Sequence, residues 1–411
     1  MLAHRQEVKL LGNEHAVGGV WSTSLHCFPP YGTHCFYKQS SPMRLATLTV
    51  CFFAFGYPLA RASEPANDDA MRFTRAQKRE FQGLDYAQEG KWNKPFFFLQ
   101  LADTQYGFFT QNQGFQQEVT LVNRAIQHVN RLKPRFVIVC GDLTHAIPSD
   151  PRYTAQVRQF KADFSKVSKD IPLVCVCGNH DIGNQPDPVL ISSYRKHFGD
   201  DYFGFWVGGV RCLVLNSSVI KDSKSAPDVL AQQEEWFKTM LRQAQQAQAQ
   251  HILVFQHHPW FLKTEDEPEE YFNLPVARRV AALTAMKRYN VRAIFAGHYH
   301  RNSYGKAGNV EMITSGPVGR PLGKDPSGFR VVKVYQDHLE HKYYALDAVP
   351  TQIQLTSNQR TPPAVPGTTV KRVATLSHPP QTHRAAENIS SRLRRRILAP
   401  APTAGINPSS R

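Results

Sequence analysis

The fold is decided by the stretch Val174-Cys175-Val176-Cys177-Gly178-Asn179-His180-Asp181, in which an apolar run ends at a glycine. An amide, an imidazole and a carboxylate then follow in three consecutive positions. Strands that are buried on both faces read as continuous hydrophobic runs, and ligands of open α/β sheets bind beyond the carboxyl ends of such strands. The stretch therefore predicts a buried strand that carries polar chemistry at its carboxyl end.

The chain around this stretch alternates between strand and helix patterns. Apolar runs at 96–101, 136–140 and 171–177 predict strands, and the segments 116–132 and 155–167 between them predict helices. A β-α-β-α-β order of this kind is typical of a parallel sheet with right-handed crossovers.

The second half of the sequence predicts further elements of the same kinds. Gly208-Gly209 joins strands 202–207 and 210–215 in a hairpin. Helices at 230–250 and 275–289 alternate with strands at 252–255 and 292–295. The last apolar segments, 311–314, 330–335 and 341–344, are expected to be antiparallel strands that close a second sheet.

Five of the predicted strands end in polar side chains that can ligate a metal. These ends carry Asp103 with Gln105, Asp142 with His145, Asn179 with His180 and Asp181, His257 with His258, and His298 with His300. One such residue alone is more often a cap or a satisfied core group, but five ends in one register are hard to explain in that way. Carboxylate, amide and imidazole ligands without thiolate favour Mn, Fe, Zn or Mg. A pair of such cations can clamp a phosphoryl group and lower the pKa of a shared water towards ~7.

The order of these motifs resembles that of the calcineurin-like metallophosphoesterases. The motifs are Asp103-x-Gln105, Gly141-Asp142, Gly178-Asn179-His180-Asp181, His257 and Gly297-His298-x-His300. The resemblance covers residues 93–349 and implies an α/β fold, a four-layer αββα sandwich of two mixed sheets. It places a site for two divalent metals at the carboxyl ends of the strands.

Carried over position by position, the resemblance implies a metal site with Asp142 as the bridging ligand. The expected ligands are Asp103, Asp142 and His300 for the first metal and Asn179, His257 and His298, with Asp142, for the second. His180 would act on the transition state or protonate the leaving oxygen, and Asp181 would orient its imidazole. Arg301 and Asn302 are candidates for binding phosphate oxygens.

The first motif departs from the family pattern, because Gln105 stands where the family usually has a histidine. Either Gln105 ligates the first metal through its amide oxygen, or His145 turns towards it. We favour His145, since imidazole is the better ligand for a transition metal. His258 faces away from the site if His257 is the ligand.

The resemblance implies a phosphatase that acts on phosphoserine or phosphothreonine in proteins by attack of a hydroxide bridging the metals. Alternatives are a phosphodiesterase acting on a cyclic nucleotide or nucleic acid, and a relative that binds phosphate without turnover. The loops 106–116 and 264–271 are expected to flank the cleft and to set substrate choice. A phosphoprotein is the expected partner, whereas a specific nucleic acid or a membrane is not expected.

Both ends of the chain differ from the middle in composition. Residues 1–92 form an atypical extension, in which 43–62 has the layout of a secretory signal if translation starts at Met43. Residues 351–411 hold nine Lys or Arg against one acidic residue, which is +8 of the net charge of +16. We expect 350–411 to be a basic disordered tail, since it is rich in Pro, Thr, Ser and Ala and lacks aromatic residues.

The cysteines of the central region bear on the compartment. Cys140, Cys175, Cys177 and Cys212 all lie in predicted core strands and form no disulfide framework. Free buried thiols favour a reducing compartment, so a cytoplasmic location is expected, with the secretory pathway as the alternative.

Overall fold

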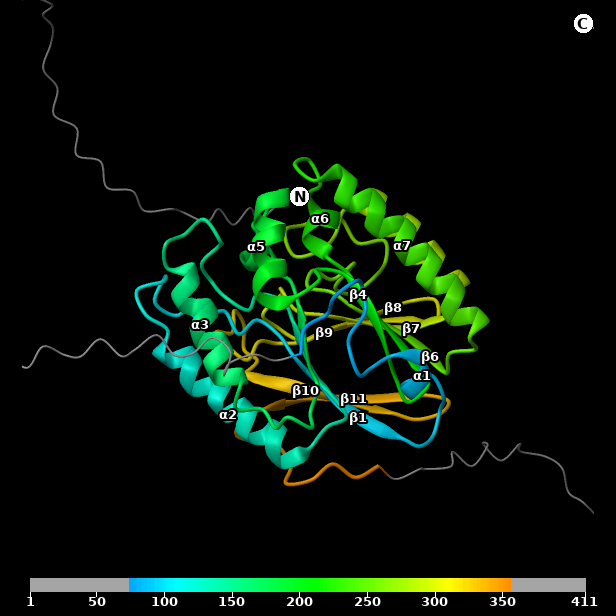
Figure 1. The fold of residues 1–411 in the computed structure, drawn as a ribbon, viewed down its shortest axis with the longest axis horizontal. Coiled ribbons are helices and arrows are strands. Elements are labelled where there is room, and N and C mark those ends of the chain that lie inside the picture. The colour runs from blue at the N-terminus through cyan, green and yellow to red at the C-terminus, as the bar shows by residue number, and fades with distance from the viewer. Residues whose placement is uncertain (1–73, 356–411) are drawn as a thin grey trace, which may run out of the picture. The chain divides into compact units, whose positions relative to one another are not determined.

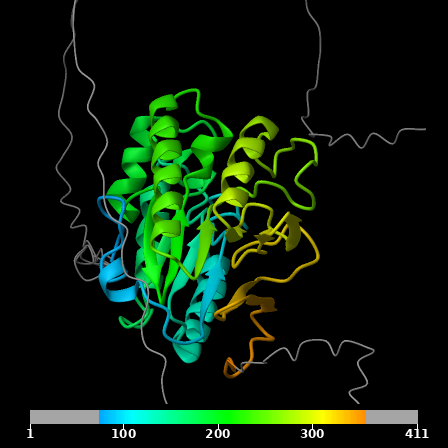
Figure 2. The same ribbon diagram turned by 90° about the vertical axis from the view of Figure 1, so that its right-hand side faces the viewer.

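The computed structural model describes residues 74–355, and within this range the chain forms two mixed β-sheets that pack face to face. The five-stranded sheet has the order β11-β10-β1-β2-β3, and the six-stranded sheet has the order β4-β5-β6-β7-β9-β8. Figures 1 and 2 show the two sheets stacked between groups of helices. The predicted four-layer αββα sandwich is confirmed.

The first half of the chain builds most of the five-stranded sheet. Its elements are α1 (Tyr86–Glu89), β1 (Phe96–Leu101), α2 (Gln116–Leu132), β2 (Val137–Cys140), α3 (Tyr153–Phe164), β3 (Leu173–Val176), α4 (Asn179–Ile182) and α5 (Pro188–Phe198). Strands β1, β2 and β3 are parallel neighbours, as the β-α-β-α-β pattern predicts. The short helices α1, α4 and α5 were not predicted.

The second half builds the six-stranded sheet and then returns to the first. Its elements are β4 (Phe203–Val207), β5 (Val210–Val214), α6 (Ser217–Lys221), α7 (Pro227–Gln246), β6 (His251–Phe255), α8 (Val276–Arg288), β7 (Val291–Ala296), β8 (Ser303–Ala307), β9 (Val310–Thr314), β10 (Gly328–Val334) and β11 (Leu339–Ala345). The expectation that the last three predicted strands close the second sheet holds for β9, which lies in the six-stranded sheet, and is wrong for β10 and β11. Strand β9 runs parallel to β7, whereas β10 pairs antiparallel with β1 in the first sheet and β11 pairs with β10. A pattern of alternating residues does not show which sheet edge is free to accept a strand.

Two apolar cores hold the layers together. One lies between the sheets, where the inward side chains include a cluster of stacked and edge-on rings, among them Phe98, Phe136, Phe205, Phe255 and Phe295. Each buried phenylalanine stabilises the fold by about 1.5–3 kcal/mol. The alternate residues of the strands face outward, where α2 and α3 cover one sheet and α7 and α8 cover the other.

The described chain begins before the predicted start of the domain at residue 93. Residues Ala76, Phe81 and Leu84 are buried in the core between the sheets, and Glu80 pairs with Gly204 beside β4. The folded unit therefore includes residues 74–92. The signal-like segment 43–62 and most of the predicted basic tail lie outside the described residues. Within 74–355, none of the helices combines the length and the apolarity that a membrane span requires.

Candidate metal centre

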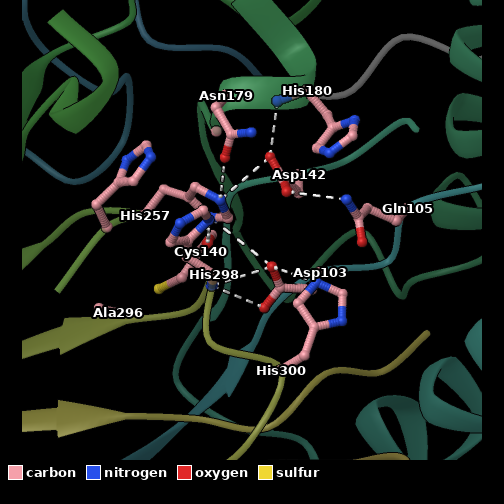
Figure 3. Close-up of polar contacts among 12 residues, drawn as sticks. Asp103, Gln105, Cys140, Asp142, Asn179, His180, His257, Ala296, His298 and His300 are labelled. Carbon is pink, nitrogen blue, oxygen red and sulfur yellow. Dashed lines mark hydrogen bonds and ion pairs between the residues drawn. The ribbon is translucent and has the colours of Figure 1, made fainter. Parts of the chain in front are cut away.

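The polar strand ends meet at one edge of the sandwich, which we call the metal edge. Asp103 follows β1, Asp142 follows β2, His257 follows β6 and His298 follows β7, while Asn179 begins α4 directly after β3. Figure 3 shows these side chains converging on a common centre from both sheets. The sequence prediction that the five ends come together is thus confirmed by the structure.

The backbone at this edge is held in conformations that ordinary residues seldom adopt. The φ angles are 51° at Asp103, 53° at Asp142, 66° at His298 and 53° at His300. Positive φ is uncommon outside glycine, costs on the order of 1–3 kcal/mol, and clusters at functional sites. These turns direct the side chains inward at the carboxyl ends of the strands.

Two glycines allow the turns to approach closely. A Cβ atom on Gly297 would lie 2.6 Å from Oδ2 of Asp103, and one on Gly178 would collide with Oδ1 of Asp142. The glycine that precedes the polar residues in the stretch 174–181 is therefore needed for space beside the carboxylate of Asp142.

Two groups of potential ligands share Asp142. Asp142, His257 and His298 form one group and Asp103, Asp142 and His300 form the other, and in each group the ligand atoms lie within 4.8 Å of one another. All five side chains are at most 4% exposed. Two sets with one carboxylate in common match the expected bridging role of Asp142 in a pair of metals.

The side chains of the two groups also contact one another. Nε2 of His257 lies 3.2 Å from Oδ1 of Asp142, and Nε2 of His300 lies 3.3 Å from Oδ1 of Asp103. The backbone N–H of His298 donates to both oxygens of Asp103, at 3.0 and 3.1 Å. Imidazole and carboxylate donors of this kind suit Mn, Fe and Zn.

The pKa values of these side chains depend on burial and on one another. Burial alone would lower the pKa of His257, but the neighbouring Asp142 raises it to about 9. Burial alone would raise the pKa of Asp142, but His257 and His180 hold it below its ordinary value. Burial, reinforced by His257, lowers the pKa of His298 to about 3. His298 is therefore neutral at pH 7, the form in which imidazole ligates metals.

Asn179 is placed as a further ligand of the second group. Its Oδ1 lies 3.1 Å from Nε2 of His257, and its Nδ2 donates to Oδ1 of Asn184 at 2.9 Å. The donation to Asn184 fixes the amide so that its oxygen points towards the ligand group (Figure 3).

Gln105 lies in hydrogen-bond contact with the shared ligand Asp142. Its Nε2 donates to Oδ2 of Asp142 at 3.0 Å, while its buried Oε1 has no hydrogen-bond partner among the described residues. An unpartnered buried oxygen is costly unless a ligand such as a cation completes it. His145 belongs to neither ligand group, and its ring lies between those of Phe108 and His180, with centroids 4.8 and 4.7 Å away. Nδ1 of His145 is likewise buried without a hydrogen-bond partner among the described residues, so the choice between Gln105 and His145 stays a prediction.

His180 is oriented differently from the prediction. Its Nδ1 donates to the backbone oxygen of His145 at 2.6 Å, and its backbone N–H donates to Oδ1 of Asp142 at 2.9 Å. The predicted contact with Asp181 is wrong. The carboxylate of Asp181 instead accepts from the backbone N–H groups of Leu143, Thr144 and Gly178.

Asp181 consequently holds the loops rather than the imidazole. It ties the backbone after Asp142 to the backbone before Asn179, so the two ligand-bearing turns keep a fixed separation. Burial and the nearby Asp142 raise the pKa of Asp181 to about 8. The sequence could not reveal this role, because adjacent residues in a short helix point in different directions.

The two candidate phosphate-binding residues have other contacts. Asn302 accepts through Oδ1 from Nη2 of Arg330 at 2.7 Å and from the N–H of Gly316 at 3.2 Å, so its amide oxygen is used within the fold. Arg301 donates to the backbone oxygen of Leu322, at 2.7 Å from Nη2, and its guanidinium lies 4.8 Å from the ring centre of Tyr299. Asn302 is thus better described as a structural residue.

Two aromatic residues that were not predicted lie against the ligands. The ring of Phe108 is 5.3 Å from that of His300, and the ring of Tyr271 is 5.1 Å from that of His298. The hydroxyl of Tyr271 also forms a hydrogen bond with Asn179. Both residues belong to the loops that were expected to flank the cleft, and only the position of these loops after a strand indicated them.

Known proteins are similar to this chain over the region that contains these motifs. A model of the family described as "Calcineurin-like phosphoesterase" matches residues 98–302. The chain is 41% identical over 290 residues to "Serine/threonine-protein phosphatase CPPED1" of Danio rerio, covering 68% of this chain and 94% of that protein. The protein of the same name from Homo sapiens is 40% identical over 287 residues, with 67% and 91% covered.

A solved structure described as a dimetal phosphatase from Danio rerio is also similar. It has a TM-score of 0.48 and 17% sequence identity, with 62% of this chain and 97% of that chain covered.

Proposed function

Since the chain belongs to the calcineurin-like phosphoesterase family and is a metal-dependent phosphatase, we propose that it hydrolyses phosphoserine and phosphothreonine in proteins. The observation that carries the proposal is the pair of ligand groups sharing Asp142, which suits a phosphoryl group held between two cations. The names of the CPPED1 relatives support a protein substrate.

When two divalent cations are bound, they supply Lewis acidity towards phosphoryl oxygens and lower the pKa of water towards about 7. Asp142 would bridge them, with Asp103, His300 and Gln105 on one side. His257, His298 and Asn179 would hold the other side. The imidazoles favour Mn, Fe or Zn over Mg in this second group.

His180 is positioned to act on the leaving oxygen. Its Nδ1–H is occupied by the backbone oxygen of His145, which leaves Nε2 as the ring nitrogen available to substrate. Its side chain is partly exposed, unlike the buried ligands. We assign His180 the stabilisation or protonation of the leaving serine or threonine oxygen, which general acid catalysis requires.

The rim of the metal edge is suited to a substrate presented on a protein surface. Tyr271 is 58% exposed while its ring contacts His298, so it can meet both the phosphate and the residues beside it. The ring of Phe108 stands beside His145 and His300 on the other group. We propose that these two side chains contact the peptide that flanks the phosphorylated residue.

The test is a comparison of substrates with the full chain reconstituted with Mn²⁺. A phosphoserine peptide and bis(p-nitrophenyl) phosphate are offered separately, and kcat/KM is measured for each. We expect turnover of the peptide, with the diester slower. Asp142→Asn removes a ligand of both groups, so loss of several kcal/mol of transition-state stabilisation lowers kcat/KM by at least roughly 10²-fold.

Glu234→Gln, an exposed position on α7, serves as the matched control and should keep full activity. Faster hydrolysis of the diester would favour the phosphodiesterase alternative. Full activity in Asp142→Asn would contradict the two-metal site.

We also propose a cytoplasmic location. The four cysteines of the described chain, Cys140, Cys175, Cys177 and Cys212, are all buried and unpaired, which supports a reducing compartment. Mass spectrometry of the mature amino terminus tests this: a chain that begins just after residue 62 would point to the secretory pathway instead.

A further inference from the structure

A cavity lies on the outer face of the six-stranded sheet, away from the metal edge. It has a volume of about 550 Å³ and is enclosed by the segment 78–86, strand β4 and helix α7. Figure 2 shows the blue segment around α1 beside the green strands of this sheet. Arg211, in its wall, sits at the amino end of β5, whereas the metal ligand His257 follows the carboxyl end of the parallel neighbour β6. The cavity and the metal edge are therefore at opposite ends of the sheet.

Arg211 is a buried cation without a carboxylate partner in the described chain. The residue is only 8% exposed, and the hydrogen bond of its guanidinium goes from Nη2 to Sδ of Met240 at 3.1 Å. Glu80 and Asp85 also line the cavity, but neither forms an ion pair with Arg211 among the described residues; Glu80 acts on Arg211 only as a more distant charge. Burial lowers the pKa of Arg211 to about 10, so the guanidinium stays charged at pH 7. A buried charge that lacks a partner is costly, and its free N–H groups match the oxygens of a carboxylate or phosphate.

The fold makes room for this guanidinium. Gly204 on β4 lies beside it, and a Cβ atom there would be 2.5 Å from Nη2. Arg211 and Trp206 are paired across the two strands, with the guanidinium carbon 5.4 Å from the ring centre of Trp206. Trp236, from α7, lines the cavity as well.

A strained turn brings a second cation to the rim. Gln77 and Glu80 exchange backbone hydrogen bonds around Lys78 and Arg79, whose φ angles are 56° and 65°. Turns with two positive φ angles normally require Asn or Gly, so Lys and Arg here are strained. Both residues line the cavity. Arg79 is engaged by Asp201 and lies over the ring of Tyr202, whereas Lys78 has no ion pair among the described residues.

From these features we infer that the cavity binds a small anion attached to a planar apolar ring. Arg211 would hold the anionic group, Lys78 would add charge at the rim, and Trp206 and Trp236 would contact the ring. The volume is in the range of small-molecule sites, which bury an apolar body against a few fixed polar groups.

The indole N–H resonances of Trp206 and Trp236 provide the test, assigned by Trp→Phe substitution in the full chain with its metals. The probes are phenylphosphonate and benzoate, with benzamide as the uncharged ring and methylphosphonate as the anion without a ring. We expect the first two to shift both indole signals saturably, and the last two to bind at least about 10-fold more weakly.

Arg211→Met should weaken phenylphosphonate binding by about 10- to 100-fold, the range for charge-assisted hydrogen bonds. Arg211→Lys keeps the positive charge but loses the paired N–H donors of the guanidinium, so its affinity for phenylphosphonate should lie between those of the unmodified chain and Arg211→Met. This variant replaces Arg211→Met in the test if Arg211→Met does not fold. The control is Arg242→Met, which replaces an exposed arginine on α7, the helix that lines the cavity. This variant should bind phenylphosphonate as tightly as the unmodified chain does.

Asp142→Asn distinguishes binding in the cavity from binding at the metal edge. The probes should still shift the indole signals in this variant. Unchanged phosphopeptide turnover in Arg211→Met would show that the variant is folded. Indole signals that none of the probes shifts, or that shift equally in the unmodified chain and in the Arg211 variants, would overturn the inference.

Discussion

Asp142 and Asp201 are both carboxylates that the fold buries almost completely, yet their charges are compensated in different ways. Asp201 accepts from Nη1 of Arg79 at 2.9 Å, from Nε of Arg195 at 2.7 Å and from Nδ2 of Asn216 at 2.9 Å. Asp142 meets an imidazole, an amide and a backbone N–H. We call the first set the Asp201 cluster and compare it with the metal edge.

The two carboxylates show two ways to bury a negative charge, one that serves the fold and one that serves a ligand site. Guanidinium groups stay protonated, so the Asp201 cluster carries its own counter-charge and fixes the segment around Arg79 to β4. Imidazole can lose its proton and become a ligand, so the metal edge is completed only by cations. Beside these ligands, Oε1 of Gln105 and Nδ1 of His145 are buried without a hydrogen-bond partner among the described residues, which suits atoms that a cation could complete.

The largest expected effect comes from breaking the Asp201 cluster. Asp201→Ala leaves Arg195 partly buried without its partner, and removal of one member of a buried pair costs about 3–5 kcal/mol. Urea unfolding should show this loss in the free energy of unfolding. The control Glu234→Ala removes an exposed ion pair with Arg278 and should cost less than about 1 kcal/mol. Equal losses in the two variants would refute the structural role of Asp201.

Adding metal should stabilise the metal edge and leave the Asp201 cluster unaffected. Mn²⁺ at roughly 100 times its Kd should raise the free energy of unfolding by about 2.7 kcal/mol per site. Asp201→Ala should have a lower free energy of unfolding without metal but the same increase when Mn²⁺ is added. His298→Ala should show a smaller increase, because this substitution removes a candidate ligand. Thermal unfolding with and without a chelator measures both. A full gain in His298→Ala would speak against the assigned ligand set.

Acid should act on the Asp201 cluster. Burial alone would raise the pKa of Asp201, but Arg195 and Arg79 hold it below the ordinary value of 3.8. A carboxyl with a lowered pKa in the folded state stabilises the fold above pH 3.8, and this contribution is lost as the pH falls through the folded value. As the pH falls below about 4, the free energy of unfolding of the metal-free chain should therefore decline more steeply than that of Asp201→Asn. Identical pH profiles would contradict the assigned compensation.

Much of the metal edge could be predicted from sequence because its ligands follow strands. Asp103, Asp142, His257 and His298 each come directly after an apolar run, and parallel strands bring their carboxyl ends to one edge. The Asp201 cluster was missed, because Arg79 lies 122 positions away from Asp201 in the sequence, and the nearer partners Arg195 and Asn216 do not follow a ligand-bearing strand end. The partner of Asp181 was misjudged for a related reason. Sequence adjacency to His180 does not specify side-chain direction, which the turn after Gly178 decides.

The smallest expected effect is the change in metal affinity when Gln105 is replaced, because an amide is a weaker ligand than an imidazole or a carboxylate. If the free oxygen of Gln105 completes the first ligand group, Gln105→Ala should lower metal affinity by about 10-fold, equivalent to about 1.4 kcal/mol. Gln105→His should restore or raise the affinity for Zn²⁺ or Mn²⁺, because imidazole is the better ligand for a transition metal. His145→Ala is the matched control, since its ring contacts Phe108 and His180 and belongs to neither ligand group.

Equilibrium dialysis with metal analysis distinguishes these variants. Loss of one metal equivalent in His145→Ala, with retention of two in Gln105→Ala, would reassign the first site to the histidine. The expected reverse result would mean that the family's missing imidazole is replaced by an amide already hydrogen-bonded to the bridging Asp142. In that case the two groups differ in ligand strength, and the group that contains Gln105 should lose its cation first as a chelator is added.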